Sequence, residues 1–204
     1  MKIEVLPLGL LGTNCYMLSS ERAAIVIDPG YQSPKTAAFL EQNADKERMI
    51  LITHAHFDHI MGADALREQT GVKIGIGEGD AGGLYNTQDS LAVRFRAKCE
   101  PLQADITFKN GEKIAVGDIT AEIIETPGHT PGGVCYLIGD CLFSGDTLFL
   151  ESYGRTDFIG GDDRAMKDSL QRLFSLDEMV KVYPGHGGTT TIEHEKRWNP
   201  MVLS

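Results

Sequence analysis

The segment THAHFDH, residues 53–59, constrains the fold more than any other feature of the sequence. It places four potential metal ligands within six residues: His54, His56, Asp58 and His59. The segment follows the apolar run Met49–Thr53, which predicts a buried β-strand. If the strand stays extended, His54 and His56 point to the same side, whereas Asp58 and His59 lie at the expected start of a helix. The backbone cannot easily wrap all four around one ion, so the pattern favours two metal ions.

Each residue of this cluster also has an ordinary structural explanation. An aspartate at a helix start commonly caps the helix, so Asp58 alone does not indicate a metal site. A single histidine is more often a core or surface residue than a ligand. Four ligand-type side chains at this spacing are harder to explain in that way, and they predict further ligands from distant parts of the chain.

Three later loops contain side chains of the same kind. His129 lies in TPGHTPG, Asp146 lies in SGDT and His186 lies in PGHG. Each loop follows an apolar run with strand character, and each has glycine or proline at turn positions. Loops that follow strands can meet at one edge of a sheet, where binding sites usually lie. The remaining histidine, His194, lies between two glutamates and is expected on a solvated helix.

Apolar runs predict strands in both halves of the chain, followed in each half by a helix. The first three runs are separated by Gly-rich or charged turns, which favours an antiparallel meander. The predicted strands cover residues 3–8, 15–18, 24–27, 49–53, 113–116, 120–126, 133–138, 141–144 and 180–183. The predicted helices cover residues 34–43, 59–69 and 163–174. This order suits sheets packed on each other with helices outside, and no boundary divides residues 1–204 into two domains.

Composition and charge limit the partners and the compartment. The chain has 19 Lys and Arg against 29 Asp and Glu, a net charge of −10 that repels polyanions, so no nucleic acid partner is expected. A chain of this length buries about 70% of its unfolded surface without help from a metal, so a metal site would be functional. No apolar stretch is long enough to span a membrane, and we expect a cytoplasmic protein. The four cysteines form no Cys-x-x-Cys pair; Cys135 and Cys141 are expected in the core.

The motifs THAHFDH, TPGHTPGG, GDTLF and YPGHG together resemble those of the metallo-β-lactamase superfamily. More narrowly, they are similar to the glyoxalase II (hydroxyacylglutathione hydrolase) branch in its short, single-domain form. The resemblance extends from about Gly12 to Pro200 and includes GRTDF and EHEKRWNP. It implies an α/β (α+β) fold, a four-layer αββα sandwich of two mixed sheets flanked by helices.

The resemblance also implies roles for individual residues. His54, His56 and His129 would bind a first metal, Asp58, His59 and His186 a second, and Asp146 would bridge the two. Two divalent ions are expected, zinc first, with iron or manganese as alternatives. Such a pair can share a water and lower its pKa from 15.7 toward about 7, which gives a hydroxide nucleophile. Asp58 is the expected catalytic residue, and the chain has no G-x-S-x-G motif that would suggest a serine nucleophile.

Positions around these ligands have supporting roles in the same interpretation. Asp28 is expected to accept a hydrogen bond from a metal-binding histidine, and Asn14 to shape the floor of the site. Gly145 and Gly185 are expected to let the backbone approach the metals. By residue chemistry alone, Asn14 and Asp28 are equally well explained as turn formers.

The expected substrate is a small thioester, S-lactoylglutathione or a relative. Arg155 either meets a substrate carboxylate or forms a salt bridge with Asp157 or Asp163. Two tyrosines that contact glutathione in longer members of the branch correspond to Asp157 and Gly188, which argues against strict selectivity for glutathione.

The sequence is also compatible with other activities. A persulfide dioxygenase of the same superfamily would use one iron, bound here by His56 or a neighbour, His129 and Asp146. A phosphodiesterase or nuclease is disfavoured by the acidic charge. A non-catalytic binding role is disfavoured because every ligand position holds a ligand-type residue.

Overall fold

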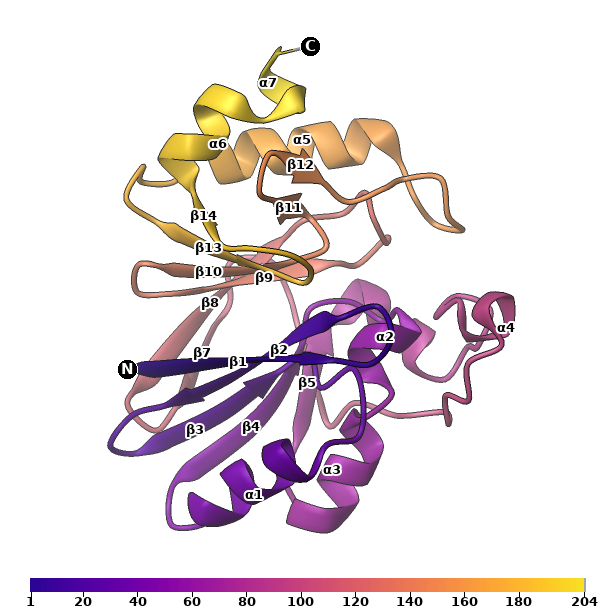
Figure 1. Cartoon of the computed structure of the whole chain (residues 1–204), viewed down its shortest axis with the longest axis vertical. Helices are drawn as coiled ribbons and strands as arrows, with labels where there is room; N and C mark the ends of the chain where they lie inside the picture. The colour runs from indigo at the N-terminus through magenta and orange to yellow at the C-terminus, as the bar shows by residue number, and fades with distance from the viewer. Residues whose placement is uncertain (204) are drawn as a thin grey trace.

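The apolar runs of the first half form one mixed six-stranded sheet. In this computed structural model, which describes residues 1–203, the spatial order of the strands follows the chain order (Figure 1). The first three strands pair antiparallel, which confirms the predicted meander. From the third strand to the sixth, neighbouring strands pair parallel. The strands are β1 (Lys2–Leu8), β2 (Thr13–Ser19), β3 (Ala23–Ile27), β4 (Glu47–Ile52), β5 (Ile74–Gly77) and β6 (Ile106–Phe108).

The second half forms another mixed six-stranded sheet, in the order β14-β13-β10-β9-β8-β7. Its strands β8, β10 and β13 all run in the same direction, because β9 is antiparallel to both β8 and β10 while β10 is parallel to β13. The strands are β7 (Lys113–Val116), β8 (Ile119–Glu125), β9 (Val134–Ile138), β10 (Cys141–Gly145), β13 (Lys181–Pro184) and β14 (Thr190–Thr191). A short separate hairpin pairs β11 (Leu148–Phe149) with β12 (Ser152–Tyr153).

Helices cover the outer face of each sheet, so the molecule has four layers (Figure 1). Five helices lie in the chain between β3 and β6: α1 (Pro34–Gln42), α2 (Phe57–Ile60), α3 (Ala63–Thr70), the 3₁₀ helix η1 (Glu78–Leu84) and α4 (Ala92–Phe95). The helices of the second half are α5 (Asp163–Phe174), α6 (Ile192–Trp198) and α7 (Pro200–Leu203). The predicted αββα sandwich is confirmed.

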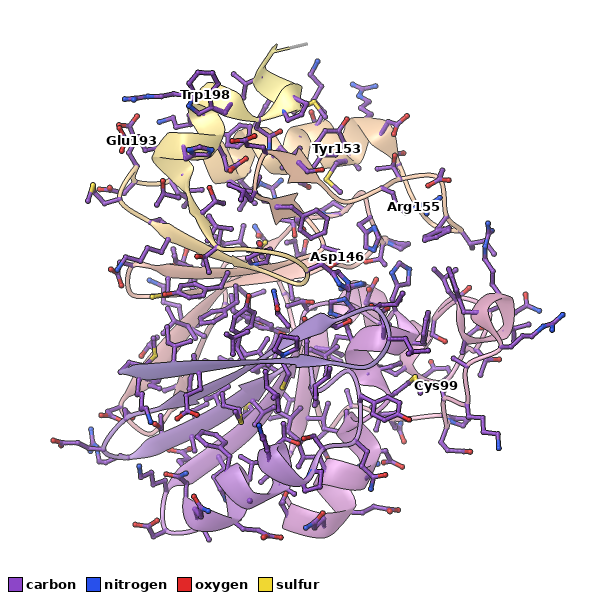
Figure 2. The ribbon with its side chains drawn as sticks, viewed as in Figure 1. Cys99, Asp146, Tyr153, Arg155, Glu193 and Trp198 are labelled. Atoms are coloured by element: carbon purple, nitrogen blue, oxygen red, sulfur yellow. The ribbon has the colours of Figure 1, made fainter. Side chains whose placement is uncertain are left out.

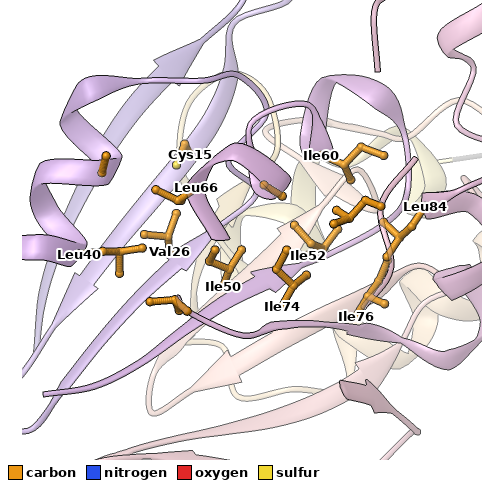
Figure 3. Close-up of a cluster of buried hydrophobic side chains, with 14 of the residues drawn as sticks. Cys15, Val26, Leu40, Ile50, Ile52, Ile60, Leu66, Ile74, Ile76 and Leu84 are labelled. Atoms are coloured by element: carbon orange, nitrogen blue, oxygen red, sulfur yellow. The ribbon is translucent and has the colours of Figure 1, made fainter. Parts of the chain in front are cut away.

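Three buried apolar clusters separate these layers. In β4, Ile50 and Ile52 point toward α1 and α3, as Figure 3 shows, whereas Leu51 points toward the second sheet. A parallel strand between two layers is buried on both faces, so its side chains are apolar on both sides. On the other side, Met166 and Leu170 of α5 bury one face of that helix against the second sheet. The layers thus form around strands whose two faces are both buried.

The predicted helix 59–69 is wrong as a single helix. The structure has two helices, α2 and α3, separated at Gly62. The Gly62 N–H donates to the Pro29 carbonyl at 2.9 Å instead of continuing the helix. A Cβ on Gly62 would lie 2.6 Å from that carbonyl oxygen, so only glycine allows this approach. The break leaves α2 as one short turn at the site.

The cysteines, residues 71–108 and the helix lengths complete the description of the fold. Cys135 and Cys141 are buried as expected, and all four cysteines are free thiols. Residues 71–108, for which no elements were predicted, contain β5, η1, α4 and β6. Across residues 1–203 no helix has both the length and the apolar character needed to cross a bilayer.

Candidate metal centre

The sequence-predicted ligands meet where the two sheets open at one edge. His54 and His56 follow β4, and α2 carries Asp58 and His59 directly afterward. His129, Asp146 and His186 follow β8, β10 and β13, which end at the same edge of the second sheet because they run in the same direction. Figure 2 shows Asp146 between the two halves of the molecule. The parallel strand directions explain why residues 130 positions apart in the chain are neighbours.

The seven side chains divide into two sets joined by a carboxylate. Each set has ligand atoms within 4.8 Å of one another; the first comprises His54, His56 and His129, and the second Asp58, His59 and His186. Asp146 groups with His54 and His59. Its Oδ1 lies 3.4 Å from His59 Nε2, and its Oδ2 lies 3.5 Å from His129 Nε2. Oδ2 also lies 3.6 Å from His186 Nε2, so the Asp146 carboxylate borders both sets.

Hydrogen bonds orient three of the imidazole rings. Nδ1 of His59 lies 2.9 Å from Asp28 Oδ2, Nδ1 of His129 lies 2.7 Å from the Arg155 carbonyl, and Nδ1 of His186 lies 3.2 Å from the Leu11 carbonyl. Carbonyl and carboxylate oxygens only accept, so the ring Nδ1 donates in each case. Nε2 then presents its lone pair to the centre of the cluster, as a metal ligand must.

Buried nitrogen atoms without hydrogen-bond partners test whether the cluster fits a cation. The Nε2 atoms of His54, His56, His59 and His129 are all buried and unpaired, and so is Asp146 Oδ1. Buried polar atoms are nearly always satisfied, and leaving several unpaired in one place is costly. Divalent cations would satisfy all of them at once, and imidazole and carboxylate are suitable donors. The donor set fits the metals that the sequence implies.

The pKa values of the histidines shift in opposite directions in the two sets. Burial, reinforced by neighbouring histidines, lowers the pKa of His56 to about 3, and that of His54 also well below its usual value. These rings are neutral at physiological pH and available as ligands. Burial would lower the pKa of His59, but the carboxylates of Asp58, Asp146 and Asp28 raise it well above normal.

The carboxylates respond in the opposite sense. Burial would raise the pKa of Asp58 and of Asp146, but the charge on His59, together with neighbouring histidines and hydrogen bonds, outweighs it and lowers both. Thr13 Oγ1 also donates to Asp58 Oδ2 at 2.9 Å. Both carboxylates are therefore ionised, and Asp58 gives the second set an anionic ligand that the three histidines of the first set lack.

Asp28, expected to support a histidine, connects two parts of the site. Its Oδ2 accepts from His59 Nδ1, as noted, and from Thr53 Oγ1 at 2.6 Å, while its Oδ1 accepts from the Thr53 N–H at 2.7 Å. Its backbone has a left-handed φ of 49°, which Asp tolerates better than most residues. The residue thus holds the end of β4 and the ring of His59 in one arrangement.

Asn14 and two glycines bring the last ligand loop close. Asn14 Nδ2 donates to the carbonyls of Pro184 and Gly187, on either side of His186. A Cβ on Gly185 would collide with Asp146 Oδ1 and lie 2.7 Å from His59 Cε1. A Cβ on Gly145 would lie 2.5 Å from Thr53 Oγ1. The close approach of backbone to the cluster is therefore as the sequence predicted.

Asp80, in η1, is a site residue that the sequence reasoning missed. It is buried, and its Oδ2 accepts from the Ala55 N–H at 3.0 Å and its Oδ1 from the Gly132 N–H at 2.6 Å. Ala55 lies between His54 and His56, and Gly132 closes the loop of His129. Asp80 therefore ties together the two segments that carry the first set. The available signal was an acid among glycines after an apolar run, IGIGEGD, the same pattern that identified Asp146.

Replacing Asp80 by alanine should misplace the first set. Two buried N–H groups would lose their acceptor, which we expect to lower the free energy of unfolding by about 2–4 kcal/mol. Metal content, measured by elemental analysis on folded protein, should fall from the wild-type value. Asp105→Ala is the matched control, because Asp105 Oδ2 also accepts a backbone N–H, from Ile74, at the start of the neighbouring strand. Equal metal content in both variants would contradict a positioning role for Asp80.

A cavity of about 470 Å³ opens onto both sets of ligands. Its wall includes Phe57, Phe95, Phe149 and Phe158, and its polar lining includes Asp58 and Asp146. Arg155 lies at its rim, labelled in Figure 2, where Nε and Nη2 each lie 2.6 Å from a carboxylate oxygen of Asp157. Of the two interpretations of Arg155, the salt bridge with Asp157 is present. His194 lies away from the cluster on α6, 2.9 Å from Glu151.

Comparison with known proteins places this architecture in a family. A model of the metallo-beta-lactamase superfamily matches residues 8–186. The hydroxyacylglutathione hydrolase GloC of Haemophilus influenzae is 33% identical over 211 residues, covering 100% of this chain and 99% of that protein.

Two solved structures are similar over the whole chain. The B3 metallo-beta-lactamase BLEG-1 has a TM-score of 0.89 at 32% identity, covering 100% of both chains. ETHE1 from Myxococcus xanthus has a TM-score of 0.79 at 31% identity, covering 100% of this chain and 86% of that one. The chain belongs to the metallo-beta-lactamase superfamily, most of whose members are metal-dependent hydrolases.

Proposed function

We propose that this protein is a dinuclear metal hydrolase that cleaves small thioesters, such as S-lactoylglutathione. His54, His56 and His129 would hold one ion, Asp58, His59 and His186 the other, and Asp146 would bridge them. The observation that carries the proposal is the set of four buried, unpaired Nε2 atoms around a carboxylate whose oxygens face both sets. Zinc is the first candidate, with iron and manganese as alternatives.

The reaction follows from the placement of these groups. When bound, the metals supply a water of lowered pKa and a Lewis acid for the thioester carbonyl. Asp58 lines the cavity and is ionised, so it can accept a hydrogen bond from a water there and orient its oxygen toward the carbonyl carbon. The phenylalanine wall offers the acyl group an apolar surface. The C–O bond forms, the C–S bond breaks, and the thiol leaves as a thiolate, which needs no strong acid because free thiols have a pKa of about 8.5.

The choice of substrate class has support from the chain itself. The cavity lining contains one serine, Ser152, and no cysteine, and the ligand-type side chains gathered at the site are histidines and aspartates, which favours water as the attacking group. The GloC relative is named a hydroxyacylglutathione hydrolase, and the similar BLEG-1 structure is named a B3 metallo-beta-lactamase. An aspartate at the bridging position favours a thioester over a β-lactam in our interpretation. The net charge of −10 supports a small-molecule substrate rather than a nucleic acid.

The direct test combines metal content with thiol release. We expect close to two metals per chain and release of free thiol from S-lactoylglutathione under air. Asp58→Ala serves as the background, since it removes the carboxylate from both the second set and the cavity wall. A β-lactam should be cleaved far more slowly than the thioester. Thiol release by the wild-type protein no faster than by Asp58→Ala would contradict the proposal.

A persulfide dioxygenase is the second candidate, favoured by the similarity to ETHE1 and by the grouping of His56 and His129 beside Asp146. This reaction would add both atoms of O₂ to the outer sulfur of a persulfide and, with water, release sulfite and a thiol. One iron per chain, together with oxygen uptake on addition of glutathione persulfide and no thioester cleavage, would establish it in place of the hydrolase.

A further inference from the structure

A short basic segment stands beside the cavity of this acidic protein. Arg94, Arg96 and Lys98 alternate along residues 94–98 and are all exposed. Among residues 1–203 none of the three forms an ion pair, although 29 acidic residues are available in the sequence. Unpaired cations concentrated at one place in a chain of net charge −10 make a local positive field that attracts anions.

This segment lies along a groove that continues from the metal centre. The groove has a volume of about 280 Å³, and Arg96 is the residue of the basic segment that lines it, next to Ala97. It shares with the main cavity the lining residues Leu11, Phe57, Asp58 and Phe95. The rest of its lining is largely apolar and includes Leu8, Leu10, Tyr31 and Met61. A flexible apolar arm can therefore run from Asp58 to the basic segment without leaving the protein surface.

Aromatic contacts hold the segment against the site. Phe95 stacks on Phe57 with ring centroids 5.2 Å apart and meets Phe158 edge-on at 6.1 Å. Phe158 in turn lies 6.1 Å from the ring of His56. The helix α4 that carries Phe95 is bounded by Leu91 and Arg96, both with left-handed φ, 62° and 53°. Two such non-glycine residues are costly, so packing rather than local preference maintains this conformation.

The two arginines at the rim have different electrostatic roles. The guanidinium carbon of Arg155 lies 3.9 Å from the Phe158 ring centroid, and that of Arg94 lies 5.0 Å from it. Arg155 is already neutralised by Asp157 through two hydrogen bonds. Arg94 forms no ion pair within residues 1–203, although its charge helps to lower the pKa of the Asp157 carboxyl after the larger effect of Arg155. In Figure 1, α4 lies across the opening from the loop between β12 and α5, which carries Arg155 and Phe158.

We infer that Arg94, Arg96 and Lys98 bind an anionic group on the thiol carrier of the substrate. The carrier's arm would lie in the apolar groove, with the thioester carbon beside Asp58. The anion is a phosphate or a carboxylate, either of which guanidinium groups bind through paired hydrogen bonds. This inference rests on the proposed thioesterase function and names its substrate class as thioesters of anionic carriers.

The test compares one acyl group on three carriers. Acetyl thioesters of coenzyme A, glutathione and N-acetylcysteamine present phosphates, carboxylates and no anion, respectively. We expect kcat/KM for one anionic carrier to exceed that for the neutral carrier by about tenfold or more at low salt, and the ratio to fall as salt screens the charges. A higher ratio for coenzyme A identifies phosphate as the anion, and a higher ratio for glutathione identifies carboxylate.

The triple variant R94Q/R96Q/K98Q should bring that ratio close to one. The matched control is K35Q/K73Q/K181Q, which removes the same charge from three exposed lysines, at the starts of α1, β5 and β13, away from the site. The control should keep the wild-type ratio. An unchanged ratio in R94Q/R96Q/K98Q, or an equal loss in both triple variants, would overturn the inference.

A binding experiment separates this inference from the proposed function. Adenosine 3′,5′-bisphosphate and S-methylglutathione carry the anions but no free thiol or thioester. Calorimetry should detect binding of one of them to wild-type protein, weakened about tenfold or more in R94Q/R96Q/K98Q. If all three thioesters, including the neutral one, resist cleavage, the proposed function fails. If the neutral thioester is cleaved as well as the others and neither probe binds, only the inference fails.

Discussion

Asp146→Asn is expected to lower thioester hydrolysis by about three orders of magnitude, because loss of metal-based charge stabilisation costs several kcal/mol and each 1.36 kcal/mol is a factor of ten. The substitution keeps the shape of the side chain but removes its charge. An amide has only one good ligand oxygen, so it cannot present two charged oxygens to the neighbouring sets as Asp146 does. Steady-state rates of thiol release measure the effect, and elemental analysis should show less than the wild-type metal content.

Asp140→Asn is a closely matched control for this prediction. Asp140 directly precedes β10 and Asp146 directly follows it, so the same chemical change is made at opposite ends of one strand. Asp140 is exposed in the turn between β9 and β10. The control should retain wild-type rate and metal content. Full metal content and full rate in Asp146→Asn would show that the carboxylate does not bridge.

Asp28→Ala is expected to lower the free energy of unfolding by about 3 kcal/mol, because it leaves three buried donors without their acceptor. These donors are the Thr53 N–H, the Thr53 hydroxyl and His59 Nδ1. With the ring of His59 no longer held, metal affinity should also fall by about 10–100-fold, as for other partners of ligand histidines. Chemical denaturation of chelator-treated protein measures the first effect free of any contribution from bound metal.

Asp28→Asn separates the backbone contribution from the hydrogen bonds. Asn tolerates the left-handed φ of this position as well as Asp does, and it retains one acceptor oxygen. It should therefore be less destabilised than Asp28→Ala while still losing metal affinity, measured by competition with a chromophoric chelator. Wild-type affinity in both variants would mean that Asp28 stabilises the fold without orienting His59.

The seven candidate ligands could be read from the sequence because the chemistry of the site is written in short, local motifs. A histidine or aspartate beside glycine after an apolar run marks a strand-end loop, and TPGHT, GDT and PGHG have this form. The segment THAHFDH instead places four ligand-type residues directly after an apolar run. The same reasoning predicted most strands, since alternation and turn residues are local properties. It also predicted α5 at residues 163–174, because Met166, Leu170 and Leu173 recur at helical spacing.

Interactions between distant segments were beyond local patterns. The break at Gly62 depends on a hydrogen bond to Pro29, and nothing in the spacing of residues 59–69 reveals that contact. Asp80 became part of the site only because η1 passes beside the loop of His129. The two alternatives for Arg155 were equally consistent with the sequence, and only the structure shows that its guanidinium is hydrogen-bonded to Asp157.

The sequence by itself determined which residues have metal-ligand chemistry, the order of strands and helices around them, and the acidic charge that disfavours polyanionic partners. The division of the ligands into two sets was implied by the family resemblance, and the tertiary structure brings those side chains together. Only the tertiary structure showed that Asp80 joins the segments of the first set and which cations border the cavity. The physical reason is that ligand type and hydrophobic periodicity are encoded over a few neighbouring residues. The grouping of side chains depends instead on strand direction and on the packing of two sheets, which join residues far apart in the chain.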